Sequence, residues 1–278
     1  MNAIQFSLLQ PSPQLSRDVE SIRVTTHPGS VAAEVSVCPS GYPGIVFQLA
    51  KDGTAAIERI VMRRAQQTEI PLLFLHGQDS EPSVMHFKAI PFTTIQVVFK
   101  SHALYSLFGF DASTLRGGSL PPEQFGAKEL ERTMLLTQSN TERVTLIEQF
   151  LIERLEQTNK RDELIEQMLT YMRERIAELS VRRVLSDFPI SERQFQKRFA
   201  RVVGMPPQLY IRLIRVNEAI RLLKSRQFDR LADVAYQLNY FDQSHFIREM
   251  KRFSFINPKS LTMQERGLHV DETGASYT

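Results

Sequence analysis

The side chains best suited to chemistry in this sequence are basic ones that recur at helical spacing. Residues 191–202 place Arg193, Lys197 and Arg201 on one face of a helix. Residues 242–253 repeat this design 51 residues later, with Ser244, Arg248 and Arg252 at the matching positions. An α-helix fits the DNA major groove, where Arg and Lys pair with guanine edges and Gln pairs with adenine. The spacing therefore predicts two helices that read DNA.

The opposite face of each segment is apolar. The matching apolar side chains are Phe195, Phe199 and Val202 in the first segment, and Phe246, Met250 and Phe253 in the second. Taken singly, each segment is an ordinary amphipathic helix of a bundle. Repetition with the same polarity favours DNA binding over that simpler interpretation.

The charge distribution points the same way. The 278 residues have a net charge of +3, which divides into −4 over residues 1–180, +9 over 181–260 and −2 over 261–278. Such a basic block attached to an acidic remainder is typical of a module that binds a polyanion. The sequence shows no signal peptide and no apolar stretch long enough to cross a membrane, so we expect a cytoplasmic protein without membrane contact.

Residue types for catalysis or metal binding are sparse. Cys38 is the single cysteine, and the six histidines form no His-x-His or His-x-x-x-His pair. The sequence also lacks a Gly-rich phosphate loop and a nucleophile elbow. We expect no enzyme activity, no metal and no cofactor, and we do not expect His76, His86 and His102 to converge in one site. Two alternatives stay open: a repair-type protein that uses Cys38, and a small-molecule-binding or enzymatic β-domain whose basic C-terminal half mediates protein contacts.

The elements that position the basic helices follow from hydrophobic periodicity. Short Val-, Ile- and Phe-rich runs separated by Pro, Gly and Asp predict strands at 21–27, 31–37, 44–50, 71–77, 83–89 and 93–100. The period becomes helical from residue 101, with a short helix between Ser101 as the cap and Gly109. Longer apolar stripes follow at 141–157, with Thr141 as a possible cap, and at 164–176. We expect both stripes to be core, with the first as an alternative dimerisation seam.

These elements predict an α+β protein with a strand-rich, sandwich- or barrel-like N-terminal domain. The all-α remainder consists of short helices that begin after Ser180, Ser191, Asp229 and Asp242. We place a sensor or dimerisation domain at 1–160, a DNA-binding domain at 161–264 and a polar, mobile tail at 265–278.

The basic block resembles a known family. The segments SERQFQKRF, VGMPPQLYIRLIRVNEAIRLL and YFDQSHFIREMKRFSFINP are similar to the DNA-binding domain of the arabinose-regulator (AraC) family of bacterial transcription factors. The resemblance covers about residues 162–264. It implies two helix-turn-helix units joined by a long helix near 207–224, and it implies sequence-specific transcriptional regulation. It also implies a homodimer, a small-molecule effector and contact with RNA polymerase as partners besides operator DNA.

The resemblance assigns contacts residue by residue. The base-contact candidates are Arg193, Gln196, Lys197, Gln243, Ser244, His245 and Arg248. The phosphate-contact candidates are Arg182, Arg201, Arg212, Lys251 and Arg252. Arg198 flanks the buried stripe, so a structural role is open for it.

The sequence departs from the family at the turns. Pro189 and Asn239 stand where the turn glycine is usual, and Leu185 replaces the alanine that Ala235 keeps in the second unit. Asn adopts the left-handed conformation at modest cost, whereas Pro cannot adopt it. We therefore expect the first turn to take another geometry.

Overall fold

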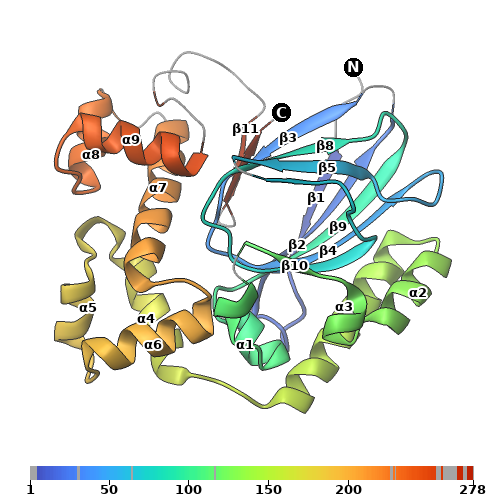
Figure 1. Ribbon diagram of the computed structural model, residues 1–278, viewed down its shortest axis with the longest axis horizontal. Helices are drawn as coiled ribbons and strands as arrows, with labels where there is room; N and C mark the ends of the chain where they lie inside the picture. The colour runs from blue at the N-terminus through green and yellow to red at the C-terminus, as the bar shows by residue number, and fades with distance from the viewer. Residues whose placement is uncertain are drawn as a thin grey trace.

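A computed structural model describes residues 5–29, 32–63, 65–115, 117–225, 228, 230–254, 258, 268–271 and 274–277. Two six-stranded sheets with antiparallel pairing make up the strand-rich part, to which both ends of the chain contribute strands (Figure 1). The first sheet has the order β1 (Gln5–Leu9), β2 (Val19–His27), β9 (Phe92–Phe99), β4 (Gly44–Ala50), β7 (Leu73–His76) and β10 (Ser119–Leu120). The second has the order β11 (Leu268–Asp271), β12 (Gly274–Tyr277), β3 (Ala33–Val37), β8 (Ser83–Phe87), β5 (Ile57–Met62) and β6 (Gln66–Gln67).

The six strands predicted from the sequence are present as β2, β3, β4, β7, β8 and β9. The strands β1 and β5 and the two-residue strands β6 and β10 were not predicted. All five residues of β1 are exposed in the structure. In the region predicted as a tail, β11 and β12 form a hairpin, and β12 pairs with β3.

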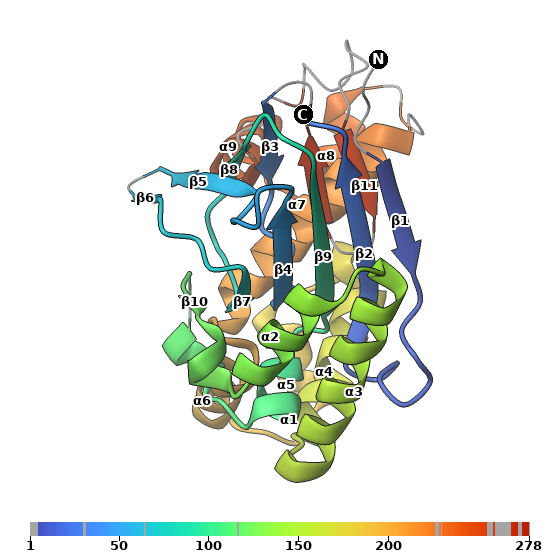
Figure 2. The same ribbon diagram turned by 90° about the vertical axis from the view of Figure 1, so that its right-hand side faces the viewer.

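The first sheet is covered on both faces. Ile45 and Phe47 of β4 pack with Leu104 of α1 (Ala103–Phe108) and Ile147 of α3 (Asn140–Thr158) in one core. Val46, which points to the opposite face of β4, belongs to a second core with residues of the other sheet. Figure 2 shows α3 and α2 (Lys128–Leu136) in front of the first sheet. Alternation along one strand thus separates a helix-covered face from a sheet-covered face.

The helix caps in this part differ from the sequence prediction. Residue 102 is the N-cap of α1, and the Ser101 hydroxyl instead donates to the carbonyl of Gly41 at 2.7 Å. The cap of α3 is Ser139 rather than Thr141, because the Ser139 side chain accepts from the amide of Glu142. The predicted end of α1 is confirmed, since Gly109 has φ 68° and its amide donates to Tyr105 O.

The C-terminal part is all helical up to residue 254 in the described residues. It contains α4 (Glu163–Glu174), α5 (Val181–Asp187), α6 (Glu192–Val203), α7 (Pro207–Ser225), α8 (Leu231–Gln237) and α9 (Gln243–Ser254). A short 3₁₀ segment at Ile176–Glu178 follows α4, and two others, Ala112–Leu115 and Pro122–Phe125, lie between α1 and α2. The predicted α+β class, with a strand-rich part followed by a helical one, is confirmed. None of the described helices has the length and apolarity that crossing a membrane requires.

Candidate DNA-binding surface

Two helix pairs of the same design flank α7. The pair α5–α6 precedes it and the pair α8–α9 follows it (Figure 1). The Ser191 side chain accepts from the amide of Gln194 at 3.3 Å, which fixes the start of α6. Asp242 does the same for α9, accepting from the amide of His245 at 2.6 Å. Both predicted caps are present, whereas the predicted cap Asp229 lies outside the described residues.

The predicted apolar stripes face the core. Phe195, Phe199 and Val202 are fully buried, and Phe246, Met250 and Phe253 are at most 1% exposed. Phe199 also packs edge-on against Tyr210 of α7, with ring centroids 5.4 Å apart. Burial of these stripes fixes the rotation of each helix, so the basic side chains on the opposite faces are directed outward.

The two turns differ as the sequence predicts. Asn239 has φ 57°, so the second turn keeps the left-handed residue of the family pattern. The first turn runs through extended backbone at Phe188 (φ −127°, ψ 139°). The amide of Ile190 there donates to Phe188 O at 2.8 Å. The two helices of each pair are therefore joined by turns that differ in backbone geometry.

The base-contact candidates lie on the outward faces of α6 and α9. Arg193, Lys197, Gln243, Ser244 and Arg248 are exposed. Gln196 and His245 are half-buried, and both line a groove of about 920 Å³ between the two helix pairs. The imidazole of His245 also meets the ring of Tyr240 edge-on at 5.4 Å. All seven candidates are placed on one of the two recognition helices.

The phosphate-contact candidates fall into two groups. Arg182, Lys251 and Arg252 are exposed. Arg201 is exposed too, but its Nη2 donates to the Tyr105 hydroxyl of α1 at 2.5 Å. Arg212 donates from Nε and Nη2 to the two carboxylate oxygens of Glu249, at 2.8 and 2.6 Å. The guanidinium of Arg212 is therefore engaged inside the protein.

The Arg212–Glu249 pair joins the connecting helix α7 to the recognition helix α9. Glu249 is 6% exposed. Burial raises the pKa of this carboxyl, but the hydrogen bonds and charge of Arg212 outweigh burial, so the pKa lies below its usual value. Glu249 is accordingly ionised at neutral pH and paired.

Arg161 and Asp162 adjoin the predicted domain boundary and carry opposite charges. They link the two halves of the protein. Arg161 Nη2 donates to the buried carboxylate of Asp18 at 2.5 Å. Asp162 accepts from Nε and Nη2 of Arg198 on α6, at 2.9 and 2.5 Å. Arg198 is therefore structural, which was one of the two interpretations open from sequence. Together these pairs hold the strand-rich part and the first recognition helix to the same short segment.

Acid is expected to weaken this junction. Burial by itself raises the pKa of Asp18, but its interactions with His102, Arg161 and Ser106 lower it to about 2. The pKa of Asp18 in the unfolded chain is 3.8, so its ionised carboxylate stabilises the folded protein fully above about pH 4. This stabilisation is lost as the pH falls through about 2. We expect the ionised carboxylate to contribute roughly 2 kcal/mol to the free energy of unfolding. Urea unfolding of the full chain between about pH 2 and pH 5 measures this slope, and Asp18→Asn should flatten it. An equal slope in the variant would exclude Asp18 as the cause.

Contacts between the halves extend along α7. The Tyr210 hydroxyl lies 3.0 Å from Ser101 Oγ, and Tyr210 is 1% exposed. Asn217 Nδ2 donates to the carbonyls of Pro39 and Ser40 at 3.1 and 3.2 Å. Cys38 is buried against the helical part, and burial raises the pKa of its thiol to about 12. A thiol held neutral in this way is a poor nucleophile.

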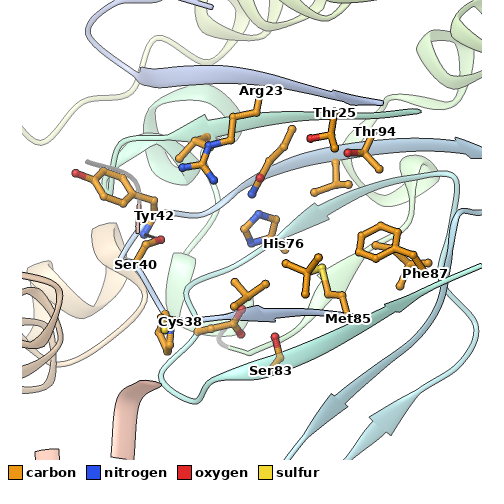
Figure 3. Close-up of a pocket in the computed structure, with 18 of the residues that line it drawn as sticks. Arg23, Thr25, Cys38, Ser40, Tyr42, His76, Ser83, Met85, Phe87 and Thr94 are labelled. Atoms are coloured by element: carbon orange, nitrogen blue, oxygen red, sulfur yellow. Dashed lines mark hydrogen bonds between the residues drawn. The ribbon is translucent and has the colours of Figure 1, made fainter. Parts of the chain in front are cut away.

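The strand-rich part encloses a cavity of about 150 Å³ between its two sheets. Figure 3 shows Arg23, Thr25 and Thr94 reaching into it from the first sheet, and Met85 and Phe87 from the second. His76 lies among them, and burial lowers its pKa to about 4, so its ring is neutral at pH 7. Met85 and Phe87 line one end of the cavity, and Arg23 and Tyr42 line the other. No motif marks this site in the sequence, because its residues come from separate strands.

The histidines do not converge, as expected. His76 lines the cavity, whereas His86 Nδ1 lies 2.9 Å from Glu34 and His102 Nε2 lies 3.4 Å from Asp18. Within the described residues no three His, Cys, Asp or Glu side chains are grouped to hold a metal ion.

Two families match parts of the chain. Residues 7–121 match a domain of unknown function (DUF6597), and residues 185–263 match a helix-turn-helix domain. No curated protein matches the chain. The second match begins within α5 and continues through α6, α7, α8 and α9.

Several solved structures are similar in fold. ToxT from Vibrio cholerae is 13% identical with a TM-score of 0.49, over 88% of this chain and 100% of that one. ToxT bound to (E)-4-(8-methylnaphthalen-1-yl)but-3-enoic acid is 14% identical with a TM-score of 0.48, over 88% and 99%. An AraC-type regulator from Chromobacterium violaceum is 21% identical with a TM-score of 0.34, over 37% and 91%.

The double helix-turn-helix arrangement and the matching domain define a DNA-binding transcriptional regulator. The helix-turn-helix match covers residues 185–263, which contain the three segments that resemble the AraC family.

Proposed function

We propose that the protein regulates transcription by reading two adjacent major-groove segments of an operator with α6 and α9. The observation that carries this proposal is the pair of capped helices with matched polarity, whose apolar stripes are buried and whose basic faces are exposed. Helix-turn-helix units place such a helix in the major groove, and successive segments on one DNA face lie about 34 Å apart. The domain division at residues 160 and 264 is part of this proposal.

The proposed base contacts are the seven side chains of α6 and α9 described above. The proposed phosphate contacts are Arg182, Lys251 and Arg252, with Arg201 joining them if Tyr105 releases it. Arg212 is left out of the proposed set because Glu249 engages its guanidinium.

The strand-rich part is proposed to sense a small molecule in the cavity between its sheets. Pro39, Ser40 and Tyr42 line this cavity. The carbonyls of Pro39 and Ser40 also accept hydrogen bonds from the Asn217 side chain of α7. A ligand there would act on the segment that contacts the helical part. Action as a homodimer and contact with RNA polymerase are proposed from the family resemblance alone.

Substitution of the central arginines tests the proposal. We expect Arg193→Ala and Arg248→Ala each to weaken operator binding by about 1–3 kcal/mol and to relax the preference at one base pair. The matched control is Arg221→Ala, which removes an exposed arginine of α7 that is paired with Glu218. Fluorescence anisotropy measures the affinity of each of the three variants for the operator. If Arg193→Ala and Arg248→Ala bind as tightly as the control Arg221→Ala, base reading by α6 and α9 is rejected.

A further inference from the structure

Two aromatic side chains of the second helix-turn-helix unit are exposed to solvent. Phe241 is 93% exposed and Tyr236 is 88% exposed, which makes them the most exposed large hydrophobic residues that the structure describes. Both lie within six residues of chain, at the end of α8 and just before α9. Single exposed apolar residues are common, but two exposed rings beside a recognition helix point to a contact surface.

The first unit provides an internal comparison. The first helices of the two units, α5 and α8, correspond at an offset of 50 residues, with Val184 and Val234 both fully buried. The recognition helices correspond at an offset of 51, so the second turn is one residue longer. Ile190 packs against the core of the helical part, as Tyr240 does in the second unit, and Phe241 is the additional residue. Tyr236 corresponds to Ser186, which is exposed as well. The helix-turn-helix design therefore does not itself require Phe241, whose exposed ring accompanies the left-handed turn at Asn239.

Phe241 stands at the end of α9 that a recognition helix directs at the bases. It directly precedes Asp242, whose carboxylate caps the helix through the amide of His245. Gln243, Ser244 and Arg248 follow on the exposed face. The N-terminal residues of a recognition helix contact base edges, and an apolar side chain there finds the C5-methyl group of thymine as its partner.

We propose that Phe241 packs against the methyl group of one thymine in the operator and so determines specificity at that base pair. This inference rests on the proposed function. Tyr236 has a different place, because α8 is the first helix of the unit, and that helix crosses the DNA backbone. Its exposed ring and hydroxyl meet sugar and phosphate, which are the same at every base pair.

The test removes the methyl group and the ring separately. An operator is first selected from random duplexes with the full chain, and each of its thymines is then replaced in turn by deoxyuridine, which lacks only the methyl group. For one thymine we expect about a three- to tenfold loss of affinity in the wild type. Phe241→Ala should show a similar loss on the thymine duplex and no further loss on the uracil duplex.

Tyr236→Ala is the matched control, since it removes an equally exposed ring from the same unit. It should change the affinities for the thymine and uracil duplexes by the same factor. Because both rings are exposed, unchanged melting midpoints should show that the two variants are folded.

Two results would overturn the inference. In the first, replacing any thymine by deoxyuridine lowers the affinity of Phe241→Ala by the same factor as that of the wild type. The second is a selected operator without an invariant thymine. In either case Arg193→Ala and Arg248→Ala would still weaken binding if the proposed function holds. If the wild type binds no duplex, the proposed function itself fails together with this inference.

Discussion

Replacement of Glu249 by alanine is expected to destabilise the protein by about 3 kcal/mol. Glu249 is buried on α9, and its carboxylate accepts both hydrogen bonds from Arg212 of α7. Removing the carboxylate leaves a half-buried guanidinium without its partner, which costs more than the pair contributed. Because the pair joins α9 to α7, the second recognition helix loses its fixed position. Urea unfolding of the full chain, followed by circular dichroism, measures the loss.

Two further variants show whether the pair itself is the cause. Glu218→Ala breaks an i,i+3 pair with Arg221, whose side chain is 59% exposed, and should cost less than about 0.5 kcal/mol. The double variant Arg212→Met with Glu249→Leu replaces the buried pair by apolar groups and should regain most of the stability. A double variant as unstable as Glu249→Ala would contradict this explanation. If that folded double variant also binds the operator as the wild type does, Arg212 makes no phosphate contact.

Replacement of Tyr210 by alanine is expected to cost about 3–5 kcal/mol. Tyr210 is 1% exposed, and its ring packs edge-on against Phe199 of α6. Its hydroxyl lies 3.0 Å from Ser101 Oγ in the strand-rich part. The substitution therefore creates a cavity where the first recognition helix, the connecting helix and the N-terminal half meet. Differential scanning calorimetry of the full chain should show a lower melting midpoint.

The conservative change Tyr210→Phe separates packing from hydrogen bonding. It keeps the ring against Phe199 and removes the hydroxyl, so we expect a loss of about 1 kcal/mol. Ser101 retains its bond to the Gly41 carbonyl in that variant. Equal losses in Tyr210→Phe and Tyr210→Ala would show that the hydroxyl, rather than the ring, holds this region together.

Local features of the helical part were predictable from sequence. The caps Ser191 and Asp242 and the buried stripes depend on residues three or four apart, so periodicity and capping chemistry suffice to find them. Asn239 was recognisable for the same reason, because a left-handed turn selects its residue type locally. The extended first turn followed from Pro189, which cannot adopt the left-handed conformation.

Features that join distant residues were not predictable. The helix face of Arg201 predicts a phosphate contact, but its guanidinium donates a hydrogen bond to Tyr105, 96 residues earlier in the chain. Arg212 likewise looks free in the sequence, because Glu249 lies 37 residues further along. The cavity depends on how two sheets close over each other, and alternation along a strand gives the face but not the partner sheet.

The affinity of the full chain for a duplex selected from genomic fragments, measured at increasing salt, tests the central claim most directly. Four or so neutralised phosphates predict a loss of affinity on the order of 100-fold between about 50 and 200 mM salt. We also expect the selected duplexes to share two half-sites about one helical turn apart. Affinity that does not change with salt, in the wild type as in Arg193→Ala and Arg248→Ala, would contradict the assignment of α6 and α9 as DNA-reading helices.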